Sequence, residues 1–193
     1  MSCRQPDFHR SYLEIQISPA GKKPHHSLGS GANPLISSAG ISKGGNNIDF
    51  KWTAPEGWTE KAGSGIRSAT FLIGDKGDIA ECAIVQLPDS GGGLAGNVKR
   101  WMKQLNYIIP SERYLHAFLS RQQRFKTAGG LNGTLIDMTG LLTGDITSRE
   151  SVMAAVIPLR EQTVFITMFG QKKPLQKNRH KLLSLGRSLH TAD

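Results

Sequence analysis

A glycine-rich loop carries the most recognisable candidate chemistry in this sequence. The stretch LPDSGGGLAGNVKRWMKQL contains a G-x-G-x-x-G pattern at Gly91, Gly93 and Gly96, between a strand-like and a helix-like segment. Glycines at this spacing can bring backbone amides close to the pyrophosphate of a dinucleotide at the start of a helix. The loop is therefore either a phosphate cradle or a turn.

The surrounding sequence favours a turn. A dinucleotide site needs a buried parallel strand before the glycines and an acidic residue near the end of the next strand, about twenty residues on. Here Pro88-Asp89-Ser90 precedes the loop, and the strand-like run after the helix, Arg121 to Thr127, is polar and basic. We interpret the loop as a flexible connector and predict no cofactor, although Lys99 and Arg100 would favour an anion at that helix start.

The same helix presents a set of polar side chains that could contact a partner. Asn97, Arg100 and Gln104 lie at i, i+3 and i+7 and therefore share one face. They could equally hold the helix in place by bonding neighbouring loops. With Arg67, they are the candidate binding residues.

Templates for catalysis and metal binding do not match. Ser64 in AGSGI and Ser30 in LGSGA lack the first glycine of G-x-S-x-G, and there is no H-E-x-x-H. Asp137, in LIDMTG, is the carboxylate embedded in an apolar strand, although a lone carboxylate more often lies on the outer face of a strand. The sequence thus predicts no catalytic residue and no metal, with Asp137 and Arg67 as the polar groups to test if the protein is an enzyme.

Basic residues gather in two zones, Lys99 to Lys126 and Lys172 to Arg187, within a chain of formal net charge +9. Such zones could bind nucleic acid, an anionic membrane surface or an acidic protein, or be no more than solvated helix faces. Trp101 and Phe118 lie in the first zone, but the helical spacing places Trp101 in the core stripe. Nucleic-acid binding through these zones is therefore an alternative function.

The two cysteines have separate meanings. Cys82 lies in a strand-like run and is predicted to be a small buried hydrophobe. Cys3 opens a polar Gly/Ser-rich tail that covers residues 1–47 and has linker composition. Ser-Cys before such a tail is how a mature bacterial lipoprotein begins. If an apolar leader precedes Met1, Cys3 would be lipidated and the protein would lie at the cell envelope; otherwise we expect the cytoplasm.

From residue 48 to 193 the chain reads as one α+β domain. Apolar segments separated by turn signals predict about seven strands, and two main helices follow the third and the last of them. The predicted strands are Ile48–Ala54, Ile66–Ile73, Ile79–Leu87, Arg121–Thr127, Leu131–Thr139, Val152–Leu159 and Thr163–Phe169. The first helix carries Leu94, Val98, Trp101 and Leu105 and ends by Pro110, Ser111 starts a short helix, and Pro174 opens the last. Strand runs separated by single helices favour an antiparallel sheet flanked by helices.

Several motifs resemble those of an uncharacterised bacterial family, of Planctomycetes and Verrucomicrobia type, whose members often carry lipoprotein leaders. The motifs are WTAPEGW at Trp52–Trp58, RSATF at Arg67–Phe71, GGGLAGNVKRWMKQL at Gly91–Leu105, L-x-D-x-x-G at Leu135–Gly140 and A-x-I-P ending at Pro158. The layout also resembles the PsbP-like fold, in which a strand and P-x-G-W open an antiparallel sheet.

This resemblance implies a non-catalytic accessory module that binds a protein or an anionic partner. The expected contacts are Gly91 to Gln104 and Arg67, and the expected core tryptophans are Trp52, Trp58 and Trp101. Nucleic-acid binding and an enzyme of unknown class are the alternatives.

Overall fold

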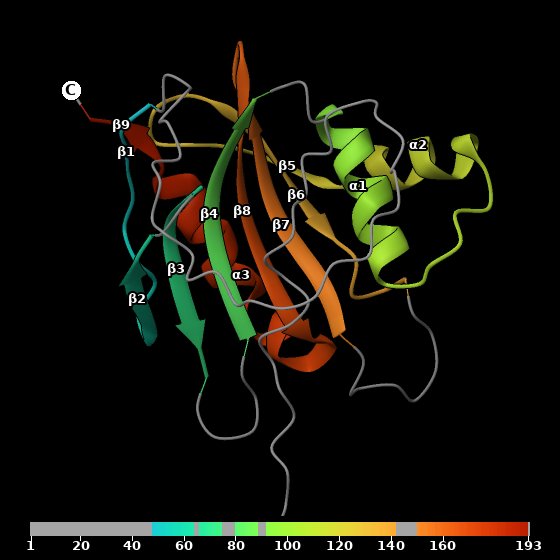
Figure 1. Ribbon diagram of the computed structural model, residues 1–193, viewed down its shortest axis with the longest axis horizontal. Coiled ribbons are helices and arrows are strands. Elements are labelled where there is room, and N and C mark those ends of the chain that lie inside the picture. The colour runs from blue at the N-terminus through green and yellow to red at the C-terminus, as the bar shows by residue number, and fades with distance from the viewer. Residues whose placement is uncertain (1–47, 64–65, 75–79, 89–91, 142–149, 193) are drawn as a thin grey trace, which may run out of the picture. The chain divides into compact units, whose positions relative to one another are not determined.

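The structure is a computed structural model that describes residues 48–63, 66–74, 80–88, 92–141 and 150–192. The predicted tail, residues 1–47, and with it Cys3, lies outside the described residues. Within the described residues, the protein is built on a seven-stranded sheet and three helices, which confirms the predicted α+β class (Figure 1).

Every strand of the main sheet pairs antiparallel with its neighbours, in the order β2-β3-β4-β8-β7-β6-β5. The strands are β2 (Trp58–Ala62), β3 (Arg67–Ile73), β4 (Ala80–Pro88), β5 (Gln123–Lys126), β6 (Asn132–Asp137), β7 (Glu150–Pro158) and β8 (Gln162–Gln171). The long strands β4, β8 and β7 form the centre. Their nearly continuous apolar sequences suit this position, because helices cover both faces there.

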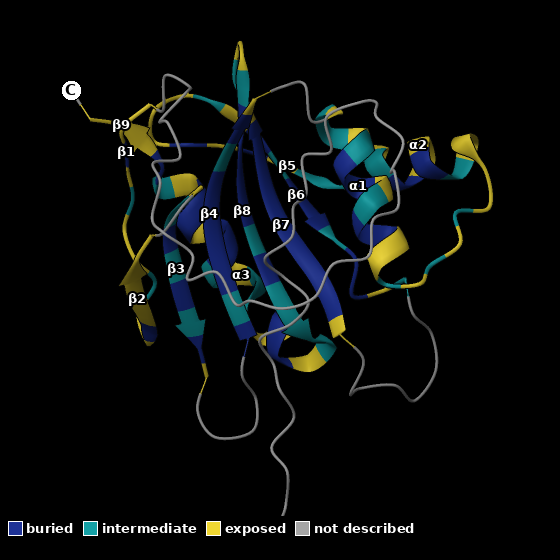
Figure 2. Cartoon of the chain, in the orientation of Figure 1, coloured by how far each residue is buried: buried dark blue, intermediate teal, exposed yellow. Residues whose placement is uncertain are grey.

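Two helices cover one face of the sheet and one covers the other (Figures 1 and 2). Helices α1 (Gly93–Gln104) and α2 (Glu112–Ser120) enclose an apolar cluster with one set of alternate strand residues, including Val156 and Phe165. Helix α3 (Lys172–Ser188) encloses a second cluster with the other set. The sheet is therefore the middle layer of three, and each strand side chain belongs to one of two surfaces.

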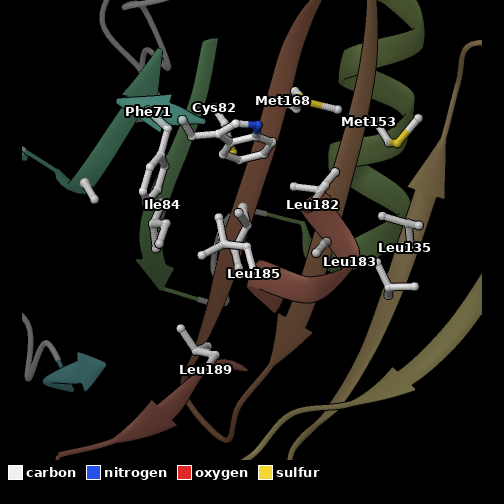
Figure 3. Packing of buried hydrophobic residues seen from close by; sticks show 14 of the residues in the cluster. Phe71, Cys82, Ile84, Leu135, Met153, Met168, Leu182, Leu183, Leu185 and Leu189 are labelled. Atoms are coloured by element: carbon white, nitrogen blue, oxygen red, sulfur yellow. The ribbon is translucent and has the colours of Figure 1, made fainter. Parts of the chain in front are cut away.

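The cluster under α3 packs leucines of the helix against alternate residues of the sheet. Figure 3 shows Leu182 and Leu185 in one cluster with sheet residues such as Phe71 and Cys82, and all four are fully buried. Burial raises the pKa of the Cys82 thiol, with a smaller contribution from the neighbouring Glu81 carboxylate. Cys82 is therefore the small hydrophobe that the sequence predicts and not a reactive thiolate.

The predicted helix end at Pro110 is wrong by about one turn. Helix α1 stops at Gln104, because Asn106 adopts a left-handed backbone with φ 54° and the Tyr107 amide donates to the Met102 carbonyl at 2.8 Å. This is the hydrogen-bond pattern of a Schellman cap, in which asparagine can replace glycine. Ser111 caps α2 as predicted, since its hydroxyl accepts from the Tyr114 amide at 3.1 Å.

The first predicted strand, Ile48–Ala54, is also wrong. Only β1 (Phe50–Lys51) is extended there, and it pairs with β9 (His190–Thr191) in a separate two-stranded sheet. The main sheet begins instead at Trp58, in β2, which lies between the predicted strands Ile48–Ala54 and Ile66–Ile73. Trp58 and Trp101 are buried as expected, whereas Trp52 is only partly buried at the rim of the core.

Candidate functional site

Helix α3 presents its polar residues as a straight stripe opposite its leucines. Lys173, Lys177, His180, Ser184 and Arg187 are all exposed and lie at successive spacings of four, three, four and three residues. That spacing keeps them on one side of a helix about 25 Å long. We call these five residues the α3 stripe.

The sequence around Pro174 explains why the helix begins where it does. Gln171, at the N-cap, has extended backbone angles, and Pro174 lies in the first helical turn. Proline is tolerated there because a first-turn amide has no partner within the helix. Helix α3 therefore starts at Lys172 and places Lys172 and Lys173 beside the positive end of its dipole.

Not all cations of α3 are equally available. Arg179 contacts the Asp137 carboxylate at 3.4 Å and donates to the Gln123 side chain at 2.8 Å. Lys181 donates to the Glu56 carbonyl at 2.7 Å. Among the described residues, none of the stripe cations Lys173, Lys177 and Arg187 forms an ion pair. The helix itself contains no acidic residue.

The helix dipole adds to this positive potential. No acidic residue lies in the first turn, whereas Lys172 and Lys173 do. Cations at a helix N-terminus are unfavourable by about 0.3–1 kcal/mol, since that end already carries a partial positive charge. The arrangement therefore costs stability in the isolated domain and would become favourable beside an anion.

The candidate contact residues of α1 do not form an open recognition face. Asn97 is buried, where its amide nitrogen donates to the Gly93 carbonyl at 2.8 Å and its oxygen accepts from Arg100 at 3.0 Å. Arg100 is half-buried and Gln104 is exposed. The geometry fits the alternative in which these groups hold the helix, and their role as a binding site stays a prediction.

Arg67 and Asp137 do not share a site. Arg67 contacts Glu81 at 2.6 Å and Thr70 at 3.3 Å, on the face of the sheet that carries α1. Asp137 faces α3, where it pairs with Arg179 and accepts from the Thr139 amide and hydroxyl at 2.9 and 2.7 Å. The two polar groups singled out for enzymatic chemistry are therefore separated by the sheet.

The two basic zones also lie on different sides. Lys99 to Lys126 runs through α1, α2 and β5, whereas Lys172 to Arg187 is α3, on the opposite face of the sheet (Figure 1). Part of the first zone is neutralised internally, since Lys99 pairs with Glu112 at 2.6 Å. The zones cannot form one continuous basic surface across the sheet.

The glycine loop is a connector between antiparallel strands and a helix. Strand β4, which precedes it, pairs antiparallel with both β3 and β8, so α1 does not belong to a parallel β-α-β unit. Gly92 and Gly93 have φ angles of 87° and 59°, a left-handed conformation that favours glycine. Gly91, and with it the start of the G-x-G-x-x-G pattern, lies outside the described residues.

The described part of the chain contains no cluster of three or more His, Cys, Asp or Glu residues that could hold a metal ion. Nor does it contain a helix both long and apolar enough to cross a membrane.

Comparison with solved structures shows a distant structural resemblance. The solution structure of cyanobacterial PsbP (CyanoP) from Synechocystis sp. PCC 6803 superposes with a TM-score of 0.40 at 14% identity, covering 81% of this chain and 99% of that chain. No protein-family model matches the sequence, and no curated protein matches it either.

Proposed function

We propose that this protein is a non-catalytic binding module that holds an anionic partner against the α3 stripe. The carrying observation is that Lys173, Lys177 and Arg187 are exposed on one side of a helix without acidic residues. None of the three forms an ion pair within the described residues. Unpaired cations aligned on a rigid surface attract and orient an anionic surface.

The rigidity of α3 supports this assignment. Leu175, Leu182 and Leu185 are fully buried against the sheet, so the backbone under the stripe is fixed. A fixed helix loses little conformational freedom when a partner binds, and affinity gains from that preorganisation. The stripe therefore suits recognition better than cations on a flexible segment would.

The distribution of reactive groups supports a non-catalytic role. Arg67 and Asp137 lie on opposite faces of the sheet, each engaged by a neighbour of opposite charge. The Cys82 thiol is buried, with its pKa raised by burial. A catalytic site needs its acid, base or nucleophile to converge on one reacting atom, and these groups do not converge.

Charge reversal on the stripe tests the proposal. Fluorescence anisotropy would measure binding of a short duplex DNA and of a polyglutamate peptide to the wild type and to Lys173→Glu/Lys177→Glu. We expect the double variant to bind at least about tenfold more weakly, since two attractive contacts become repulsive. For the DNA, loss of two phosphate contacts should also reduce the salt slope by about two.

A matched control separates this site from net charge. Lys61→Glu/Lys103→Glu makes the same change in charge at two exposed lysines on β2 and α1. The control should keep most of the binding. An equal loss of binding in both double variants would show that only the overall charge matters, and would contradict the proposed site. Loss in Arg100→Glu alone, with its melting temperature unchanged, would assign the contact to α1 instead.

The two probes also separate the partner classes. An acidic protein is the partner we propose first, and nucleic acid, the alternative, would show a steep salt dependence with the DNA and weak binding of the peptide. A tether at the cell envelope is part of the same hypothesis, through lipid on Cys3. Sequencing the genomic DNA upstream of the Met1 codon tests it: an in-frame apolar segment supports the tether, and an immediate in-frame stop contradicts it.

A further inference from the structure

A shallow depression lies at the β5 edge of the sheet, far in sequence from α3. Its volume is about 310 Å³, and it is lined by Arg124, Phe125, Asn132, Gly133, Thr134 and Pro158. Three adjacent strands contribute these residues, β5, β6 and β7. Small-molecule sites begin at about 300 Å³, so the depression can accommodate a compact ligand.

The pairing of the strands places the polar lining on one face. Arg124 pairs with Thr134 and Lys126 with Asn132 across β5 and β6. The residue between the two cations, Phe125, alternates to the other face, where it belongs to the α3 cluster. The depression therefore opens on the face that carries α1 and α2, opposite the α3 stripe.

Two glycines make room for the Phe125 ring on the α3 face, away from the polar side chains of the depression. An added Cβ at Gly133 would lie 2.3 Å from the Phe125 ring, and one at Gly186 of α3 would lie 3.1 Å from it. The ring is thus held between two glycines on the α3 side. Because Phe125 is anchored there, the floor of the depression at Phe125 and Gly133 is mainly backbone, and its rim carries the polar side chains.

Hydrogen-bond donors predominate around the depression. Arg124 supplies a guanidinium, Asn132 an amide and Thr134 a hydroxyl to the lining. Lys126 pairs with Asn132 in the register of β5 and β6 but does not line the depression. Within the described residues, Arg124 and Lys126 form no ion pair, and no carboxylate lines the depression. An anion is the ligand that such a set recognises.

We propose that this depression binds the phosphate group of a small phosphate ester. A dianionic phosphate is attracted by the Arg124 guanidinium, and its oxygens can accept from the planar guanidinium fork, the hydroxyl and the amide together. A carboxylate, with one charge and two oxygens, uses fewer of these donors. The remaining volume accommodates the organic part of the ester above the backbone floor.

Nuclear magnetic resonance titration of the full chain tests this site with defined probes: inorganic phosphate, adenosine monophosphate and acetate. We expect the amide signals of Asn132 and Thr134 to shift and saturate with millimolar phosphate or the nucleotide. Arg124→Gln should weaken that binding at least about tenfold, and Thr134→Val, which keeps a β-branched side chain, about threefold.

Lys61→Gln is the control, since it also removes one positive charge, at an exposed side chain of β2 at the opposite edge of the sheet. It should bind phosphate like the wild type. The proposal is overturned if no shift saturates, if Arg124→Gln and Lys61→Gln lose affinity equally, or if acetate binds as tightly as phosphate. Tighter binding of the nucleotide than of inorganic phosphate supports a small ester, whereas weaker binding of the nucleotide overturns it.

Discussion

At the scale of single residues, two glycines of this protein are required by packing. Gly133 and Gly186 both contact the Phe125 ring, and the added Cβ at Gly133 would overlap it. Glycine in a strand weakens the strand, yet here it gives space to a large ring from the neighbouring strand. The single Phe125 side chain thereby couples β5, β6 and α3.

Gly133→Ala should lower the free energy of unfolding by about 1–3 kcal/mol, because the new methyl group overpacks the site. Urea denaturation measures this. Gly140→Ala is the control, since an added Cβ there meets nothing within 4 Å. A Gly133→Ala protein as stable as this control would contradict the packing assigned to Phe125.

A tyrosine pair predicts a pH dependence at alkaline pH. The Tyr107 and Tyr114 hydroxyls lie 2.7 Å apart, and this hydrogen bond, together with burial, raises the pKa of Tyr107. The unfolded chain loses that proton first, so stability should fall as the pH rises above about 10 and until the folded group ionises.

Tyrosinate absorbance measures that titration. Tyr114→Phe removes the hydrogen bond and should bring the pKa of Tyr107 down towards its ordinary value. An unchanged titration curve for Tyr107 in this variant would contradict the assigned cause. Tyr12→Phe, in the segment outside the described residues, simplifies the spectrum to the pair.

At the scale of elements, the link between α1 and α2 depends on two caps. Asn106 ends α1 in a left-handed conformation and Ser111 starts α2 through its hydroxyl. Only Tyr107 to Pro110 separates them, with Ile108 87% exposed. The end of α1 and the start of α2 are therefore fixed by short-range backbone chemistry, whereas the apolar cluster holds both helices on the sheet.

Asn106→Ala should destabilise the protein by about 1 kcal/mol, since alanine resists the left-handed conformation. Asn106→Gly, at the same position, should be neutral or slightly stabilising because glycine accepts it. Thermal unfolding of the two variants checks this. Equal melting temperatures would mean that the backbone at residue 106 is not left-handed.

At the scale of the whole molecule, backbone amides should be best protected from hydrogen exchange at the centre of the main sheet and least protected in the β1–β9 pair. Strands β4, β8 and β7 are paired on both sides and covered by helices, whereas β1 and β9 form only a two-stranded sheet that is largely exposed. Two-stranded sheets are marginal in water.

Hydrogen exchange should therefore be slowest for central-strand amides such as Ile166 and fastest for the pair Lys51 and His190. The Ile166 amide should open only with global unfolding. Comparable protection at both places would show that the β1–β9 pair is part of the cooperative core.

The sequence alone determined the elements whose signal is local. Apolar runs located β3, β4, β6, β7 and β8, and leucine spacing located α3, because residues that the fold buries must be apolar wherever they lie in the chain. The sequence-based prediction was wrong at β1. Ile48, Phe50 and Trp52 alternate as in a longer strand, but only Phe50 and Lys51 are paired. Pairing partners are distant in sequence, so β1 could not be assigned to His190–Thr191 in advance.

Only the tertiary structure decided which charges are available. The sequence predicts two basic zones but not that the sheet separates them, that Glu81 engages Arg67, or that Asp137 engages Arg179. It placed Asn97 on a polar face, yet the side chain is buried. Whether a cation is exposed depends on neighbours contributed by other strands and helices. Helical and strand periods follow from the chain itself, whereas burial and ion pairing follow from contacts that only the folded chain makes.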